Sequence, residues 1–300
     1  MNNGGTTALR PLSRYGAAEI FGRAVAALEP AELRAFAGAS NRAVPCPFKP
    51  QQAVCHKKGG VCSLGLFKRD AEGAVTLEHP PVATCPSRFH EGNKVFEWVS
   101  ELLLGTRNAR VVSEVSFLMA EEEQLDTEDE VGRIDNVLVT TEGDRLKWCA
   151  LETQAVYFSG GSMESDFAQM RDWAGLGLPF PTRQRRPDFR SSGPKRLMPQ
   201  LQTKVPTLRR WGTKMAVVVD RAFFESFGEM RRARFLSNAD IVWFVLDYGR
   251  PVSGRYCLMP HEAVFTTLEH AVEGLTGGTP VSLEQFEDSI RLKLARQAAS

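Results

Sequence analysis

The sequence predicts a mixed α/β (α+β) fold, with a central mixed sheet flanked by helices and a small cysteine-rich segment ahead of it. Three observations predict this fold. Short apolar runs typical of buried strands alternate with amphipathic stretches in the second part of the chain. Four of the six cysteines fall within 40 residues, among Pro and Gly breakers. The chain has 300 residues and 43% hydrophobic content, which is enough to bury a substantial core.

The first ninety residues divide into two expected segments. Apolar spacing predicts a helix over residues 16–36, broken by Pro30, within an N-terminal helical region 1–43. Residues 44–90 are rich in turn-forming residues, and only two short strands are expected there, at 61–67 and 74–77. A segment with so little regular structure would need a bound metal to define its shape.

Residues 91–300 are expected to form the main domain. An amphipathic helix at 93–104 leads into three strands, and another helix follows at about 162–174. The Pro- and Arg-rich stretch 179–212 is either a loop or a broken helix. The expected strands are 109–118, 132–140, 145–158, 215–219 and 241–247, and the closing helices are 261–274 and 282–297.

The formal net charge of +1 hides a strong asymmetry along the chain. Residues 121–130 carry seven acidic residues and no base, whereas residues 181–214 carry ten bases and one acid. Such a concentration of positive charge suits a polyanionic partner, although a solvated loop is the alternative. The first residues lack the apolar core of a signal peptide, and no run approaches the ~20 apolar residues of a membrane span. A cytoplasmic location is therefore expected.

The clustered cysteines lie on turns, whereas Cys149 and Cys257 lie inside apolar runs and resemble core residues. In a reducing cytosol, four cysteines on turns indicate tetrahedral metal coordination rather than disulfides. Their spacing matches no common CxxC pattern, so buried thiols are the alternative, and His56 or His90 could replace one ligand. Thiolate ligands suit zinc or iron. The four candidate ligands are Cys46, Cys55, Cys62 and Cys85.

Two neighbouring strand-like segments carry acids and amides where a buried strand would be apolar. Strand side chains alternate between faces, so Glu152 and Gln154 share one face. A short polar turn at 141–144 would fold the second strand back and bring Asp135 near Glu152. Two carboxylates forced together repel each other unless a divalent cation lies between them. The sequence therefore predicts a magnesium site at Asp135 and Glu152, and an exposed pair on an edge strand is the alternative.

Together these motifs resemble the NotI family of type II restriction endonucleases, clearly over about residues 40–160 and more loosely elsewhere. The segments that carry the resemblance are AVPCPF (43–48), GVCSL (60–64), CPSRF (85–89), GRIDN (132–136) and LETQ (151–154). The resemblance implies a PD-(D/E)xK nuclease-like core beside a four-cysteine site holding iron. It also implies a bacterial homodimer that cuts double-stranded DNA within a GC-rich palindrome, with CGGCCG as the expected sequence, and leaves 5′-phosphates. A cognate methyltransferase would protect host DNA without needing to bind the enzyme.

Carried onto this chain, the motif makes Asp135 and Glu152 the magnesium ligands and puts Gln154 where lysine is usual. Ile134 replaces the motif's proline, which has no chemical role. Gln154 cannot take up a proton at neutral pH, so a lysine general base is excluded at this position and the amide could only orient the attacking water or the phosphate. Activation of the water would then come from the cation. Glu114, an acid in an apolar strand, could complete the cation's shell, take the water's proton or face solvent.

DNA recognition requires backbone contacts for affinity and bidentate arginines on guanine for sequence reading. Residues 183–190 offer four guanidinium groups together with Gln184 and Asp188. Two other functions remain open from the residues: a non-catalytic, metal-stabilised DNA-binding protein and a structure-selective DNA repair nuclease. The expected DNA contacts are Arg183, Arg185, Arg186, Arg190, Lys195, Arg196, Arg209 and Arg210.

Overall fold

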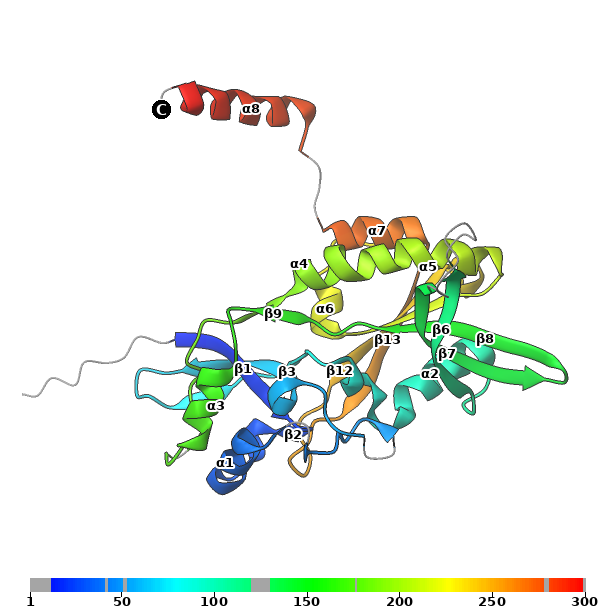
Figure 1. The fold of residues 1–300 in the computed structure, drawn as a ribbon. Coiled ribbons are helices and arrows are strands. Elements are labelled where there is room, and N and C mark those ends of the chain that lie inside the picture. Colours follow the sequence, from blue (N-terminus) through cyan, green and yellow to red (C-terminus); the bar gives the residue numbers. More distant parts are fainter. Residues whose placement is uncertain are drawn as a thin grey trace, which may run out of the picture.

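Two sheets of different size organise the chain in the computed structural model, which describes residues 12–40, 43–50, 53–119, 130–175, 177–277 and 281–298 (Figure 1). The acidic run at 121–129 lies outside the described residues. The larger sheet has six strands in the order β13-β12-β11-β8-β7-β6. The smaller sheet follows the path β2-β1-β3-β4, with β5 paired to β3.

The six-strand sheet combines an antiparallel meander with a parallel centre. β6 (Arg110–Met119), β7 (Glu130–Glu142) and β8 (Arg145–Thr153) pair antiparallel in chain order. β8 then lies parallel to β11 (Met215–Asp220), which lies parallel to β12 (Ile241–Tyr248). β13 (Leu258–Thr266) closes the far edge antiparallel to β12. The predicted mixed sheet is thus confirmed.

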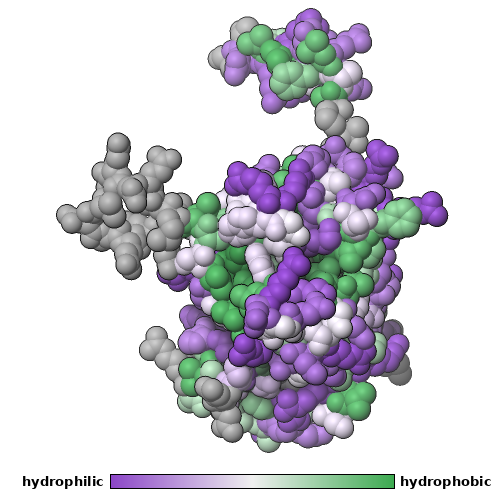
Figure 2. Space-filling model, turned by 90° about the vertical axis from the view of Figure 1, so that its right-hand side faces the viewer, coloured by the Kyte–Doolittle hydropathy of each residue, from purple (hydrophilic) through white to green (hydrophobic). Residues whose placement is uncertain are grey.

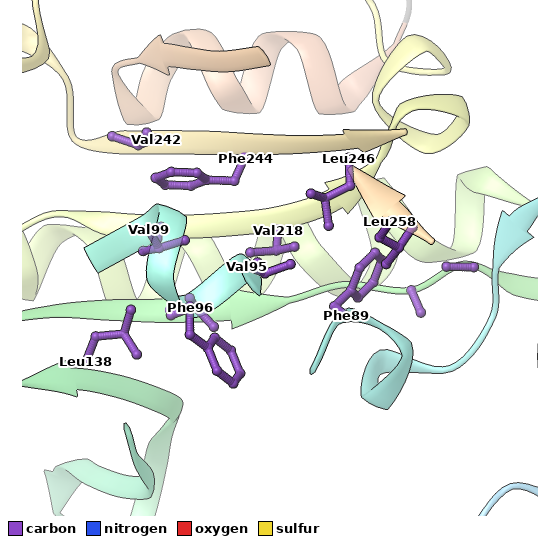
Figure 3. Close-up of a cluster of buried hydrophobic side chains, with 14 of the residues drawn as sticks. Phe89, Val95, Phe96, Val99, Leu138, Val218, Val242, Phe244, Leu246 and Leu258 are labelled. Carbon is purple, nitrogen blue, oxygen red and sulfur yellow. The ribbon is translucent and has the colours of Figure 1, made fainter. Parts of the chain in front are cut away.

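Helices cover both faces of this sheet, which explains why strands β11 and β12 at its centre are almost entirely buried. All six residues of β11 are buried, as expected for a parallel strand enclosed on both sides. Helix α2 (Lys94–Leu104) covers one face, where Val95, Phe96 and Val99 pack against Val218 and Phe244 (Figure 3). Helices α5 (Met198–Arg210) and α7 (Leu268–Thr276) supply the apolar cluster on the other face.

The expected helix over residues 16–36 is wrong in its first half. Residues 12–20 form strand β1 (Leu12–Ile20), which pairs antiparallel with β3 (Val61–Arg69). Residues 16–20 are all buried, so their apolar pattern carries no periodicity that would separate a helix from a strand. Pro30, expected to break the helix, instead begins α1 (Pro30–Gly38) at the first helical position, where its missing N–H costs nothing.

The expected helix at 261–274 is also wrong in its first part, because β13 runs to Thr266. Helix α7 begins only at Leu268, after Thr267, whose hydroxyl accepts a hydrogen bond from the His270 backbone N–H. The stretch 179–212, expected to be a loop or a broken helix, contains both: an irregular segment and the short strand β10 (Arg186–Asp188) come first. A broken helix follows, made of α4 (Phe189–Ser192), a π-helical turn at Gly193–Leu197 and α5.

The remaining elements are short, except for the last helix. No helix among the described residues is long and apolar enough to cross a membrane. The remaining strands are β2 (Arg23–Ala24), β4 (Val75–Leu77), β5 (Val82–Ala83), β9 (Tyr157–Ser159) and β10 (Arg186–Asp188), and the remaining α-helices are α3 (Glu164–Arg171), α6 (Arg221–Glu225) and α8 (Leu283–Ala298).

Candidate active site

The two candidate metal-binding carboxylates face each other across neighbouring strands. The β7–β8 ladder ends at the pair Asn136 and Leu151, and Asp135 and Glu152 are the next residues on the two strands. Directly opposed residues of an antiparallel pair place their side chains on the same face. The Glu152 side chain is only 2% exposed, whereas that of Asp135 is 45% exposed. The pair therefore runs from the interior of the sheet towards solvent.

A lysine from helix α5 bridges the two carboxylates. The Lys204 ammonium donates to Glu152 Oε2 at 2.6 Å and to Asp135 Oδ1 at 3.4 Å. Its third donor reaches Gln200 Oε1, one turn earlier in the helix, at 3.1 Å. The Lys204 side chain is only 7% exposed, so the ammonium is held inside the site rather than in solvent. Gln154 takes the motif's lysine position on β8, and Lys204, which is 52 residues from Glu152 in the chain, was not predicted from the sequence as part of the site.

The electrostatics of the site are those of a buried carboxylate beside a second acid. Burial raises the pKa of Glu152 above its ordinary range, and the neighbouring Asp135 carboxylate raises it further. The Lys204 ammonium acts in the opposite direction, because it favours the ionised form of Glu152. Two acids in this setting gain free energy from any additional cation that they can share.

Gln154 does not reach the carboxylate pair in this conformation. Its side-chain N–H donates to the carbonyl of Ala155 at 2.7 Å, and its backbone N–H donates to Val218 at 3.0 Å. The amide is buried at 7% exposure, so it is committed to the backbone where β8 ends. The position that carries lysine in the general motif therefore has a local structural contact here, and the cationic group comes from α5.

Glu114 lies beside Asp135, but its side chain points into solvent. It falls on β6 between two ladder pairs, Ser113 with Asn136 and Val115 with Ile134. Its φ of 55° lies in the left-handed region that residues with a side chain rarely adopt. The carboxylate is 66% exposed and lies 3.9 Å from Arg133 Nη1.

A cleft of about 830 Å³ opens at this point, between the cysteine-rich segment and the strands β6 and β7. Asp135 and Glu114 line its strand side, and Lys49 and His90 line the opposite side. His90 packs edge-on against Phe96 with ring centroids 4.9 Å apart. Burial and the nearby Lys49 lower the pKa of His90, so this side chain is neutral at neutral pH. The acidic edge of the sheet is thus open to a large ligand.

The four clustered cysteines approach one another in two pairs. A bridge between Pro45 and Val54 sets Cys46 beside Cys55, and the backbone N–H of Thr84 donates to the Cys62 carbonyl, next to Cys85. Burial raises the thiol pKa of both Cys55 and Cys62, and the charge of Cys85 adds to each shift. The topology therefore gathers the predicted ligands in one region.

These thiols nevertheless make local contacts in the structure. Cys55 Sγ donates to the Lys57 carbonyl at 3.6 Å, and Cys62 Sγ donates to the Gly60 carbonyl at 3.3 Å. Among the residues that the structure describes, no three Cys, His, Asp or Glu side chains are arranged to hold one metal ion. The expected four-cysteine cluster is accordingly not formed.

The predicted DNA-binding arginines divide into exposed and internally paired groups. The Arg185 side chain is fully buried and forms an ion pair with Asp166 at 2.6 Å, so it fastens its loop to α3. Arg209 is half-exposed and bridges Asp240 at 2.6 Å and Glu269 at 3.1 Å. The other six predicted contacts are exposed: Arg183, Arg186, Arg190, Lys195, Arg196 and Arg210.

Comparison with known proteins supplies the family. No curated protein matches the chain. The family model described as restriction endonuclease NotI matches residues 32–258, which is about three quarters of the chain and includes both the cysteine-rich segment and the carboxylate pair. Members of this family are site-specific deoxyribonucleases that act on DNA, and restriction endonucleases typically use a divalent metal. The chain therefore belongs to the NotI family of restriction endonucleases.

Proposed function

We propose that this enzyme makes a magnesium-dependent double-strand cut within a short GC-rich palindrome, with CGGCCG as the first sequence to test, and leaves 5′-phosphates. The observation that carries the proposal is the opposition of Asp135 and Glu152 on adjacent strands, with the Lys204 ammonium against both. A palindrome has two-fold symmetry, so the acting species is a homodimer.

The donor set of the site suits magnesium. Mg²⁺ in phosphate-processing sites is commonly bound by one or two carboxylates together with substrate phosphate and water. Asp135 and Glu152 supply two such carboxylates, one half-exposed towards the cleft and one buried. When bound, magnesium lowers the pKa of a coordinated water and neutralises charge on the phosphate.

Lys204 has two roles in this proposal. Its positive charge favours the ionised form of Glu152 and so opposes the rise in pKa that burial and Asp135 cause. Its ammonium is also a preorganised cation near the point where negative charge develops on the attacked phosphate. Gln154 stabilises the end of β8 through Ala155 and has no direct part in the reaction. Glu114, exposed beside Asp135, is available to accept the proton of the attacking water.

For the cysteine-rich segment we propose a structural iron or zinc site formed by Cys46, Cys55, Cys62 and Cys85. The support is the backbone pairing that brings their loops together and the all-thiol donor set, which suits these metals. Metal binding would deprotonate the thiols and draw them from their carbonyl contacts into one shell, so that binding contributes to folding free energy.

The exposed arginines and lysines of the basic stretch 181–214 would supply the DNA contacts. Arg186 belongs to β10, which pairs with β9 immediately after the active-site strand β8. The Arg196 guanidinium lies 3.7 Å from the ring centre of Tyr157, a half-exposed residue of β9. Bidentate arginines read guanine in the major groove, so this surface suits a GC-rich site.

Digestion of a fully sequenced plasmid with magnesium, followed by sequencing of the ends, tests the proposal. We expect discrete fragments with 5′-phosphates at one palindrome, and Asp135→Ala should abolish cutting while specific binding in calcium persists. A protein that only binds DNA would cut in neither form. A structure-selective repair nuclease would leave plain plasmid without discrete fragments and cut branched or mismatched DNA instead.

A further inference from the structure

The C-terminal helix α8 presents an apolar stripe that nothing in the described chain covers. Leu283, Phe286, Ile290 and Leu294 follow one another at spacings of three, four and four residues, which places them on one side of the helix. They are 73%, 56%, 43% and 59% exposed, respectively. Figures 1 and 2 show α8 standing apart from the rest of the protein, with hydrophobic residues on its surface.

This helix is specified locally but lacks the packing that normally stabilises a helix of its length. Ser282 and Gln285 form a reciprocal cap at its start: the Ser282 N–H donates to Gln285 Oε1 at 3.0 Å, and the Gln285 N–H donates to Ser282 Oγ at 3.2 Å. Isolated helices shorter than about 12–15 residues are marginal in water, and most helix stability in proteins comes from burial of an apolar face. The 16 residues of α8 are only just above that length, so a surface that buries the apolar stripe would stabilise the helix.

The charges of α8 indicate what that surface is. The first half of the helix carries only acids among its charged residues, and the second half carries only bases. Two parallel copies would set acid against acid and base against base. Two antiparallel copies set the acidic half of each helix against the basic half of the other, which is favourable at both ends. The acids are Glu284, Glu287 and Asp288, and the bases are Arg291, Lys293 and Arg296.

We infer that α8 pairs antiparallel with α8 of a second copy of this chain, and that the apolar stripe of each helix forms the contact. The inference deepens the two-fold dimer of the proposed function and assigns part of its contact surface. The match to the family ends at residue 258 and α8 begins at Leu283, so this contact lies outside the region shared with the family. A single pair of short helices buries less than a standard interface, so α8 strengthens a dimer rather than forming a large interface by itself.

Sedimentation velocity of full-length protein over a series of concentrations tests whether the apolar stripe of α8 contributes to association. Ile290→Glu lies near the middle of the stripe and introduces a charge from each copy, so the dimer dissociation constant should rise by about tenfold or more. Leu292→Glu is the matched control, because Leu292 is 56% exposed on the opposite side of the helix and should leave association unchanged. Equal association of wild type and both variants, or equal weakening by both, would overturn the inference.

Charge reversal tests the direction of pairing. Reversing the three acids to lysine, or the three bases to glutamate, makes α8 uniformly charged and should weaken the dimer. Reversing both halves together restores the complementary pattern and should restore association. A double reversal that stays as weak as the single ones excludes antiparallel pairing.

Association and cleavage are measured separately, so the two proposals can fail separately. A full-length protein that remains monomeric yet cuts DNA overturns the α8 contact and leaves the nuclease proposal standing. A dimer that depends on Ile290 but does not cut DNA supports the α8 contact and overturns the nuclease proposal. A monomer whose thermal stability falls with Ile290→Glu would show that the stripe docks on its own chain, which also overturns the inference.

Discussion

Lys204→Met offers the sharpest test of the active site, because two measurements should move in opposite directions. The substitution removes the ammonium that lies 2.6 Å from Glu152 and 3.4 Å from Asp135 but keeps much of the apolar stem. Unit charges about 4 Å apart interact by roughly 4 kcal/mol at an effective dielectric constant of 20. The ammonium therefore repels any cation that shares the same carboxylates, and its removal should tighten Ca²⁺ binding by about tenfold or more.

Cleavage should fall at the same time. Loss of one preorganised charged or hydrogen-bonding group at a developing oxyanion commonly costs about 10²–10³ in kcat. Removing one partner of a buried ion pair costs up to about 3–5 kcal/mol of folding free energy. The loss here should lie near the lower end, because Asp135 is 45% exposed and Glu152 can take up a proton.

The assays are calcium titration by calorimetry, single-turnover cleavage in magnesium, and urea unfolding to confirm that the variant is folded at the assay temperature. Lys68→Met is the control, because it removes a half-exposed lysine of β3 that lies outside both the carboxylate pair and the predicted DNA contacts. Tighter calcium binding with wild-type cleavage would show that Lys204 is only a counter-ion in the resting protein. Weaker calcium binding would refute the electrostatic reasoning itself.

Three further predictions concern residues outside the carboxylate pair. Arg185→Ala should destabilise the protein by up to about 3–5 kcal/mol in urea unfolding, because it leaves the Asp166 carboxylate buried and without its ion-pair partner. Arg183 is exposed, so Arg183→Ala should lower DNA affinity without changing stability. Cys62→Ser should lower both the metal content and the melting temperature of the purified protein, and Cys257→Ser should change neither; normal metal content in Cys62→Ser would remove the four-cysteine proposal. Burial raises the pKa of Asp220 from its ordinary 3.8 to about 6. The folded state therefore binds the proton of this carboxyl group more tightly than the unfolded state does. The resulting stabilisation is fully present below pH 4 and is lost as the pH rises through 6, by about 3 kcal/mol in total. Between pH 4 and a pH above 6, the difference in unfolding free energy between wild type and Asp220→Asn, measured in urea, should change by about 3 kcal/mol. A difference that does not change with pH would contradict the raised pKa of Asp220.

Local patterns in the sequence were sufficient for the strands that carry the chemistry. The side chains of a β-strand alternate between faces, so the spacing of acids in 131–139 and 147–158 already implied that Asp135 and Glu152 would meet across a hairpin. Segments 93–104, 215–219 and 241–247 were likewise identified as a helix and two strands, because their apolar spacing or continuous apolar content matches the final packing. The family resemblance rested on motifs of the same local kind.

The same local patterns failed at β1 and β13, where pairing with a neighbouring strand decided the structure. Residues 16–20 of β1 are buried on both sides of the strand, so the helical and extended interpretations fit this part of the sequence equally well. Pairing with β3 decided between them. At 261–266 the pairing of β13 with β12 overrode a helical expectation in the same way.

The tertiary structure alone decided which charged groups serve the site. Lys204 and Arg185 belong to one basic stretch and look equivalent in the sequence, yet Lys204 reaches two carboxylates on the sheet and Arg185 is buried against Asp166. The reason is physical: the partner of a buried charge depends on which helix packs on which face, and that packing joins residues far apart in the chain. The sequence by itself predicted that the two acids would lie together, and the docking of α5 onto the sheet decided which ammonium group lies against them.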